Sequence, residues 1–175
     1  MLNIPQNTGE ITASWLTEAL RSTGTLGEEK VASCTATVIG EEFGFASSIA
    51  RVRVEYDSPE FGGPKSLIAK MSTSNPDQGR TETRREKFLR ESRFYEELAP
   101  SVEIRIPRCH YVAHDPETAN LVILLEDLGR GRFGDADAGW AYNDARVVVE
   151  TFAKLHAAWW NTPRLDELDW LPRFG

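Results

Sequence analysis

The chain has 175 residues, of which 41% are hydrophobic and 27% are charged, a composition typical of a single globular domain. Its formal net charge of -7 argues against binding nucleic acid or an anionic membrane through the surface as a whole. The sequence has neither a basic N-terminal segment nor an apolar run of about 18 residues, so we expect a cytoplasmic protein without a membrane anchor.

The two cysteines, Cys34 and Cys109, lie far apart and belong to no Cys-x-x-Cys or paired-histidine motif. This spacing argues against a disulfide framework and against a zinc site. The histidines offer no third ligand either, so we expect no metal site built from this chain.

The first half of the chain is predicted to contain one helix and three strands. Thr12 can cap a helix over residues 13–22. The strands are predicted over residues 31–39, 48–56 and 66–71. In the second strand, apolar residues alternate with Arg51, Arg53 and Glu55, the period of a half-buried antiparallel strand with the charged residues on its wet face.

The second half is predicted to begin with a helix over residues 82–98, which Pro100 ends. Two further strands follow over residues 108–114 and 121–126, and the glycine-rich segment 129–139 is predicted to be a loop. A long helix is predicted over residues 140–160, followed by a segment, 165–175, without helix or strand pattern. The expected fold is α+β, with five antiparallel strands and one main helix on the sheet.

Glu91 is the most informative single residue. On a helix it shares a stripe with Phe88, Tyr95 and other apolar residues, where an unpaired charge would cost several kcal/mol. Lys70 is the expected partner, because its strand precedes this helix and places it on the same side of the sheet as Ile68. Alternatively, Lys70 extends to solvent at a strand end, and Glu91 pairs with its helix neighbours Arg84 or Lys87.

A glycine-bearing turn lies between the first two strands, over residues 40–48. Its backbone N–H groups and the hydroxyls of Ser47 and Ser48 would suit phosphate oxygens. The turn is not a Gly-x-Gly-x-x-Gly loop, however, and Gly40 and Gly44 are equally explained by the geometry of a hairpin.

The strand over residues 121–126 runs into a polar exit, where the backbone from Glu126 to Leu128 would offer an adenine base its N–H and C=O groups. This contact needs no particular side chain, and the segment is equally compatible with a plain core strand. We interpret His156, on the apolar side of its helix, as a hydrogen-bonded structural residue. His110 and His114 are interpreted as structural or solvent-facing.

Together these passages resemble the N-terminal lobe of the aminoglycoside phosphotransferase-like superfamily, and most closely its ecdysteroid-kinase-like and choline-kinase-like branches. The resemblance extends over about residues 10 to 162. It is carried by residues 40–54, Leu67-Ile-Ala-Lys70, Arg90 to Leu98, Leu124-Leu-Glu-Asp-Leu-Gly129 and Thr151 to Trp159. It implies a protein-kinase-like N-lobe over residues 1–125, with a hinge, a loop and the start of a truncated C-lobe over residues 126–175.

The resemblance also implies roles for the residues. Lys70 would contact the α- and β-phosphates of ATP and Glu91 would hold Lys70, while Ile68 would cover the adenine ring. Ser47 or Ser48, with Gly44, would lie against the phosphates, and Glu126 and Leu128 would meet the adenine.

The family's His-Gly-Asp segment and later aspartate have no counterpart in this chain, so we expect no catalytic residue and no magnesium ligand here. The resemblance implies an ATP- and Mg-dependent kinase acting on a small-molecule hydroxyl. The missing C-lobe would pack on the 140–160 helix, whose apolar stripe needs a partner. The alternative is a non-catalytic module that senses a nucleotide or binds a partner.

Overall fold

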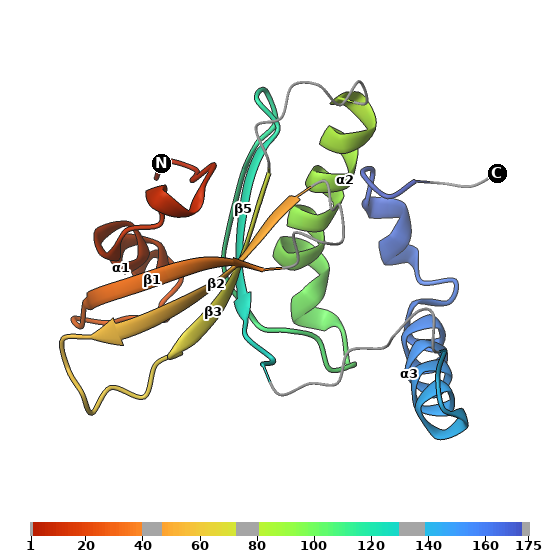
Figure 1. Ribbon diagram of the computed structural model, residues 1–175. Coiled ribbons are helices and arrows are strands. Elements are labelled where there is room, and N and C mark those ends of the chain that lie inside the picture. Colours follow the sequence, from red (N-terminus) through yellow and green to blue (C-terminus); the bar gives the residue numbers. More distant parts are fainter. Residues whose placement is uncertain (1, 40–46, 73–80, 130–138, 173–175) are drawn as a thin grey trace. The chain divides into compact units, whose positions relative to one another are not determined.

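The computed structural model describes residues 2–39, 47–72, 81–129 and 139–172 (Figure 1). The chain forms two compact units. The first comprises Met1–Glu97 with Pro107–Asp127, and the second comprises Leu98–Ile106 with Leu128–Gly175. The second unit therefore combines two segments of the chain, a short one after residue 97 and the C-terminal one from Leu128.

The first unit contains a five-stranded antiparallel sheet in the order β1-β2-β3-β5-β4, so the predicted α+β class and the strand number are confirmed. The strands are β1 (Val31–Ile39), β2 (Ser47–Tyr56), β3 (Ser66–Ser72), β4 (Cys109–Asp115) and β5 (Asn120–Glu126). Each begins and ends within one or two residues of its predicted bounds, because alternating apolar residues and turn residues mark the strand ends in the sequence.

A helix lies on each face of this sheet (Figure 1). α1 (Ala13–Ser22) begins at Thr12, whose Oγ1 accepts a hydrogen bond from the Trp15 amide at 3.2 Å, as the capping pattern predicts. Its apolar side, including Leu16 and Leu20, packs on Val52 and other residues of one sheet face. This layer is the main core of the unit.

α2 (Thr81–Arg93) lies on the opposite face, where Phe88 packs against Leu121 and Ile123 of β5. The predicted helix to Leu98 is present, but its last turn is a π-helical turn (Phe94–Leu98), followed by a 3-10 turn (Ala99–Ser101). The spacing of apolar residues predicts helical structure here, but it does not distinguish an α-helical turn from a π-helical turn. The helical segment ends close to Pro100, as expected.

The second unit contains α3 (Tyr142–Trp159) and a 3-10 helix (Pro163–Glu167). The 3-10 helix corrects the expectation that residues 165–175 lack helical structure, and the reason is that a single turn starting at a proline is too short to show a period. None of the α3 residues, all of which the structure describes, is buried. None of the helices in the described part of the chain combines the length and hydropathy needed to cross a bilayer.

Because α1 closes one face of the sheet, we expect Leu16→Ala to lower the free energy of unfolding by about 2–5 kcal/mol, through lost burial and the cavity that remains. Urea unfolding followed by tryptophan fluorescence measures this change. Val38→Ala, on β1 and 38% exposed, is the control and should change stability by about 0.5 kcal/mol or less. Equal effects of the two substitutions would contradict the packing described for α1.

Candidate nucleotide-binding site

An ion pair joins the sheet to α2. Lys70 Nζ donates to both carboxylate oxygens of Glu91, at 2.8 Å to Oε1 and 2.6 Å to Oε2. The predicted pair therefore forms, and Glu91 contacts Lys70 rather than its helix neighbour Lys87. Arg84, the other alternative, has a side chain outside the described residues.

The Lys70–Glu91 pair follows from the alternation of side chains along β3 and from the helical spacing of side chains on α2. In β3 the side chains of Ile68 and Lys70 lie on one face, and Lys70 is opposite Ile123 of β5 in the register. On α2, Glu91 lies three residues after Phe88, which packs on Ile123. The strand and the helix thus bring opposite charges to the same apolar surface.

The two charged side chains are neither buried nor free in solvent. Lys70 is 25% exposed and Glu91 is 28% exposed. Their contact removes the penalty of placing a carboxylate beside apolar residues. The remaining exposure leaves the ammonium group accessible to a further anion, and two of its three N–H groups are used by Glu91.

The carboxylate of Glu91 also affects the pKa of Tyr95. The pKa of Tyr95 is raised to about 12, mainly by burial and in addition by the negative charge of Glu91. The phenol therefore stays neutral and adds no negative charge beside Lys70. Burial also raises the pKa of the Cys109 thiol, to about 11, so this thiol is neutral as well.

The strand register separates the two serines of the predicted phosphate loop. Ser48 is opposite Met71, whose side chain lies in the core under α1, so Ser48 lies on the sheet face away from Lys70. Ser47 pairs with Ser72, and its side chain lies outside the described residues. Gly44 is also outside them. The phosphate contact predicted for Ser47 and Gly44 thus falls outside the described residues.

Ile68 lies half-buried on the Lys70 face, opposite Leu125. At the end of β5 the amide N–H of Glu126 donates to the Arg108 carbonyl at 2.8 Å, and its Oε2 accepts from the Arg108 amide at 3.1 Å. The adenine contact predicted for this segment therefore has to use other backbone groups. Leu128 is exposed and belongs to the second unit.

Sequence reasoning missed a second ion pair on this face. Asp127, directly after β5, accepts from Arg51 Nε at 2.8 Å and from Ser66 Oγ at 2.5 Å. The alternation of β2 had assigned Arg51 to a wet face, and no sequence signal shows that β5 ends beside it. The contact depends on the pairing of three strands that are distant in the sequence.

The model of the ecdysteroid kinase-like family matches residues 41–165, well over half of the chain. The chain belongs to the ecdysteroid kinase-like family. No curated protein and no solved structure matches it.

The family assignment confirms the predicted resemblance and its kinase-like fold, a five-stranded antiparallel sheet with helices. The matched segment begins at residue 41, after α1 and β1. Both elements nevertheless belong to the unit, because β1 pairs with β2 and α1 contributes to the main core. The first unit thus includes an N-terminal layer that the family model does not match.

Magnesium is the metal that a kinase-like family implies. Within the described ranges, no three side chains of histidine, cysteine, aspartate or glutamate gather as a metal site. The described residues therefore offer no ready-made cluster of ligands for a magnesium ion. The ammonium group of Lys70, in contrast, suits phosphate oxygens.

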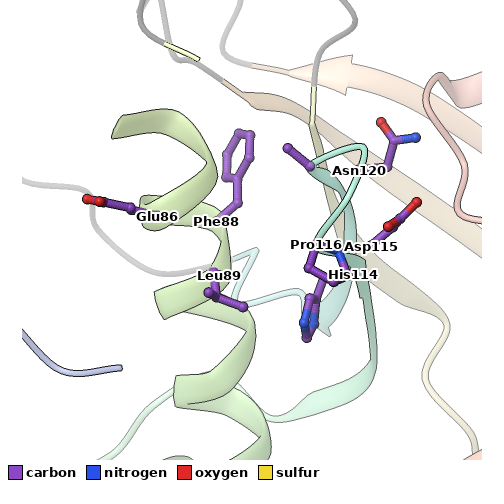
Figure 2. A pocket seen from close by; sticks show the side chains of 8 residues that line it. Glu86, Phe88, Leu89, His114, Asp115, Pro116 and Asn120 are labelled. Atoms are coloured by element: carbon purple, nitrogen blue, oxygen red, sulfur yellow. The ribbon is translucent and has the colours of Figure 1, made fainter. Parts of the chain in front are cut away.

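A cavity of about 210 Å³ lies between α2 and the β4–β5 hairpin (Figure 2). Phe88 and Leu89 line it from the helix, and His114 and Pro116 line it from the hairpin. Neither Lys70 nor Glu91 borders it, so this cavity is not the candidate nucleotide site. Among the described residues, Nδ1 of His114 is buried without a hydrogen-bond partner, which differs from a satisfied structural histidine.

The other two histidines have different surroundings. His110 is buried, its Nδ1 lies 3.5 Å from Thr25 Oγ1, and burial, followed by the charge of Arg108, lowers its pKa, so it is a neutral structural residue as predicted. The interpretation of His156 as a structural histidine stays a prediction. This residue is exposed on α3, because none of the α3 residues is buried and the stripe that should enclose it is uncovered.

Because Glu91 is one cause of the raised pKa of Tyr95, we expect Glu91→Gln to lower that pKa from about 12 toward the ordinary value. Burial is the larger cause, so the pKa should stay above 10. A pH titration of tyrosine absorbance or NMR shifts measures it. Tyr56 is the internal control, because burial alone raises its pKa to about 12. An unchanged pKa of Tyr95 in the Glu91→Gln variant would show that Glu91 does not lie beside it.

Proposed function

We propose that this chain is the nucleotide-binding part of an ATP-dependent phosphotransferase that transfers the γ-phosphate to a hydroxyl of a small molecule. The observation that carries the proposal is the Lys70–Glu91 pair, which links β3 to α2 in a chain of a kinase-like family. A lysine held by a helix glutamate is the arrangement that kinases use to orient ATP phosphates.

The physical reason is electrostatic. The transferred phosphoryl group carries spread negative charge, and catalysis consists mainly of holding and neutralising it. Glu91 fixes the position of the Lys70 ammonium and compensates its charge when no nucleotide is bound. In the reaction, the substrate hydroxyl oxygen bonds to the γ-phosphorus, the bond to the β–γ bridging oxygen breaks, and ADP leaves. The hydroxyl proton goes to a base.

That base, a carboxylate by family resemblance, and the ligands of the magnesium ion are expected in a C-lobe that follows this segment in a longer protein. The exposed apolar side of α3 supports this proposal, since Val149 is 67% exposed and Phe152 is 53% exposed. Apolar area of this kind is normally covered by another layer. A cytosolic location is part of the proposal, because Cys34 and Cys109 are not in a disulfide.

If Lys70 neutralises ATP phosphates, Lys70→Ala should weaken ATP binding roughly 10- to 100-fold, the usual effect of losing a hydrogen bond between charged groups. The increase in melting temperature on adding MgATP to the full-length natural protein measures this. Lys65→Ala is the matched control, since Lys65 is an exposed lysine one residue before β3. Equal protection of both variants would contradict the assignment of Lys70.

The transfer reaction itself is tested by ADP release from MgATP in the presence of a panel of small hydroxyl compounds. We expect release by the full-length protein that depends on the hydroxyl compound and is lost in Lys70→Ala. Nucleotide binding without transfer to any hydroxyl would favour the alternative, a non-catalytic nucleotide-sensing module. The intact mass of the natural protein decides whether a C-lobe is present, because it must exceed the mass of 175 residues.

A further inference from the structure

The end of β5 is held by side chains on both of its neighbouring strands. The Asp127 carboxylate accepts two hydrogen bonds from Arg51, from Nε at 2.8 Å and from Nη2 at 3.3 Å. It also accepts one from Ser66 Oγ at 2.5 Å. On the other side, the backbone of Arg108 binds Glu126.

The position of this network in the sheet is specific. Glu126, opposite Leu67, is the last residue of β5 that pairs with β3. Asp127 follows Glu126. Its side chain therefore connects the end of β5 to β2 and β3 directly after the last backbone pair between β3 and β5. Arg51 is opposite Ile68 in the register and therefore lies on the face of the sheet that carries Lys70.

The low exposure of Asp127 and the geometry of the Arg51 guanidinium explain why this ion pair is held in one orientation. Asp127 is 9% exposed, so its carboxylate needs a partner, whereas Arg51 is 36% exposed. A guanidinium that donates two hydrogen bonds to one carboxylate fixes both distance and angle. A lysine would not supply this fork. The backbone of Asp127 is thereby held relative to β2 and β3.

We propose that Arg51, Asp127 and Ser66 are positioning residues for the adenine base: they hold the backbone that leaves β5 where it donates to and accepts from adenine. This inference rests on the proposed function. Backbone groups bind a base more tightly when they are held in place before it binds, because ordering them on binding lowers affinity. The network therefore acts on the adenine end of ATP, and Lys70 acts on the phosphates.

The test compares ATP with inorganic tripolyphosphate, which lacks the adenine and ribose, as ligands of the full-length natural protein. We expect Arg51→Met and Asp127→Asn each to weaken ATP binding about tenfold, with tripolyphosphate binding unchanged. The double variant should be no weaker than the single ones, because both remove the same contact. Lys70→Ala should weaken both ligands.

Arg53→Met is the matched control, because Arg53 is an exposed arginine two residues further along β2. Ser66→Ala is a milder variant that removes one hydrogen bond, for use if either charge variant does not fold. For it we expect faster amide hydrogen exchange at residues 126–129 without nucleotide, and a smaller loss of ATP affinity.

The outcomes separate this inference from the proposed function. If the unsubstituted protein binds neither ATP nor tripolyphosphate, the proposed function is wrong, and the inference falls with it. If it binds both, and Arg51→Met and Asp127→Asn match Arg53→Met or weaken both ligands alike, only the inference is wrong.

Discussion

The structure depends on how a charged pair is accommodated on an apolar sheet face. Lys70 and Glu91 lie among side chains such as Phe88 and Ile123, where either charge alone would cost several kcal/mol. Together they are neutral, and each remains about one quarter exposed. The pair therefore constrains the register of β3 against β5 and the rotation of α2, and still leaves an ammonium group that can bind an anion.

The two faces of the sheet consequently differ in character. The face under α1 is closed, with residues such as Leu16, Val52 and Leu124 without exposed area, and it supplies most of the hydrophobic stabilisation. The face under α2 holds a smaller apolar cluster together with Lys70 and Arg51. Separating the stabilising layer from the charged layer allows one sheet to support a binding site without placing unpaired charges in its main core.

The two ion pairs described on the α2 side of the sheet connect different elements. Lys70–Glu91 connects strand to helix, whereas Arg51–Asp127 connects β2 to the chain that leaves β5. In a kinase-like fold these are the places where phosphates and base are expected. The chain belongs to the ecdysteroid kinase-like family, and none of the residues of α3 is buried.

The sequence by itself determined the strands and the main helices, since the periods of apolar residues, Thr12 and Pro100 mark their bounds, but not the π-helical turn after α2 or the 3-10 helix after α3. It also indicated the Lys70–Glu91 pair, because a carboxylate on an apolar helix stripe demands a partner and the preceding strand offers one. Only the tertiary structure decided the strand order, and with it the faces of Ser48 and Arg51 and the contact with Asp127. The physical reason is that periodicity is local, whereas pairing between strands distant in the chain depends on the packing of the whole sheet.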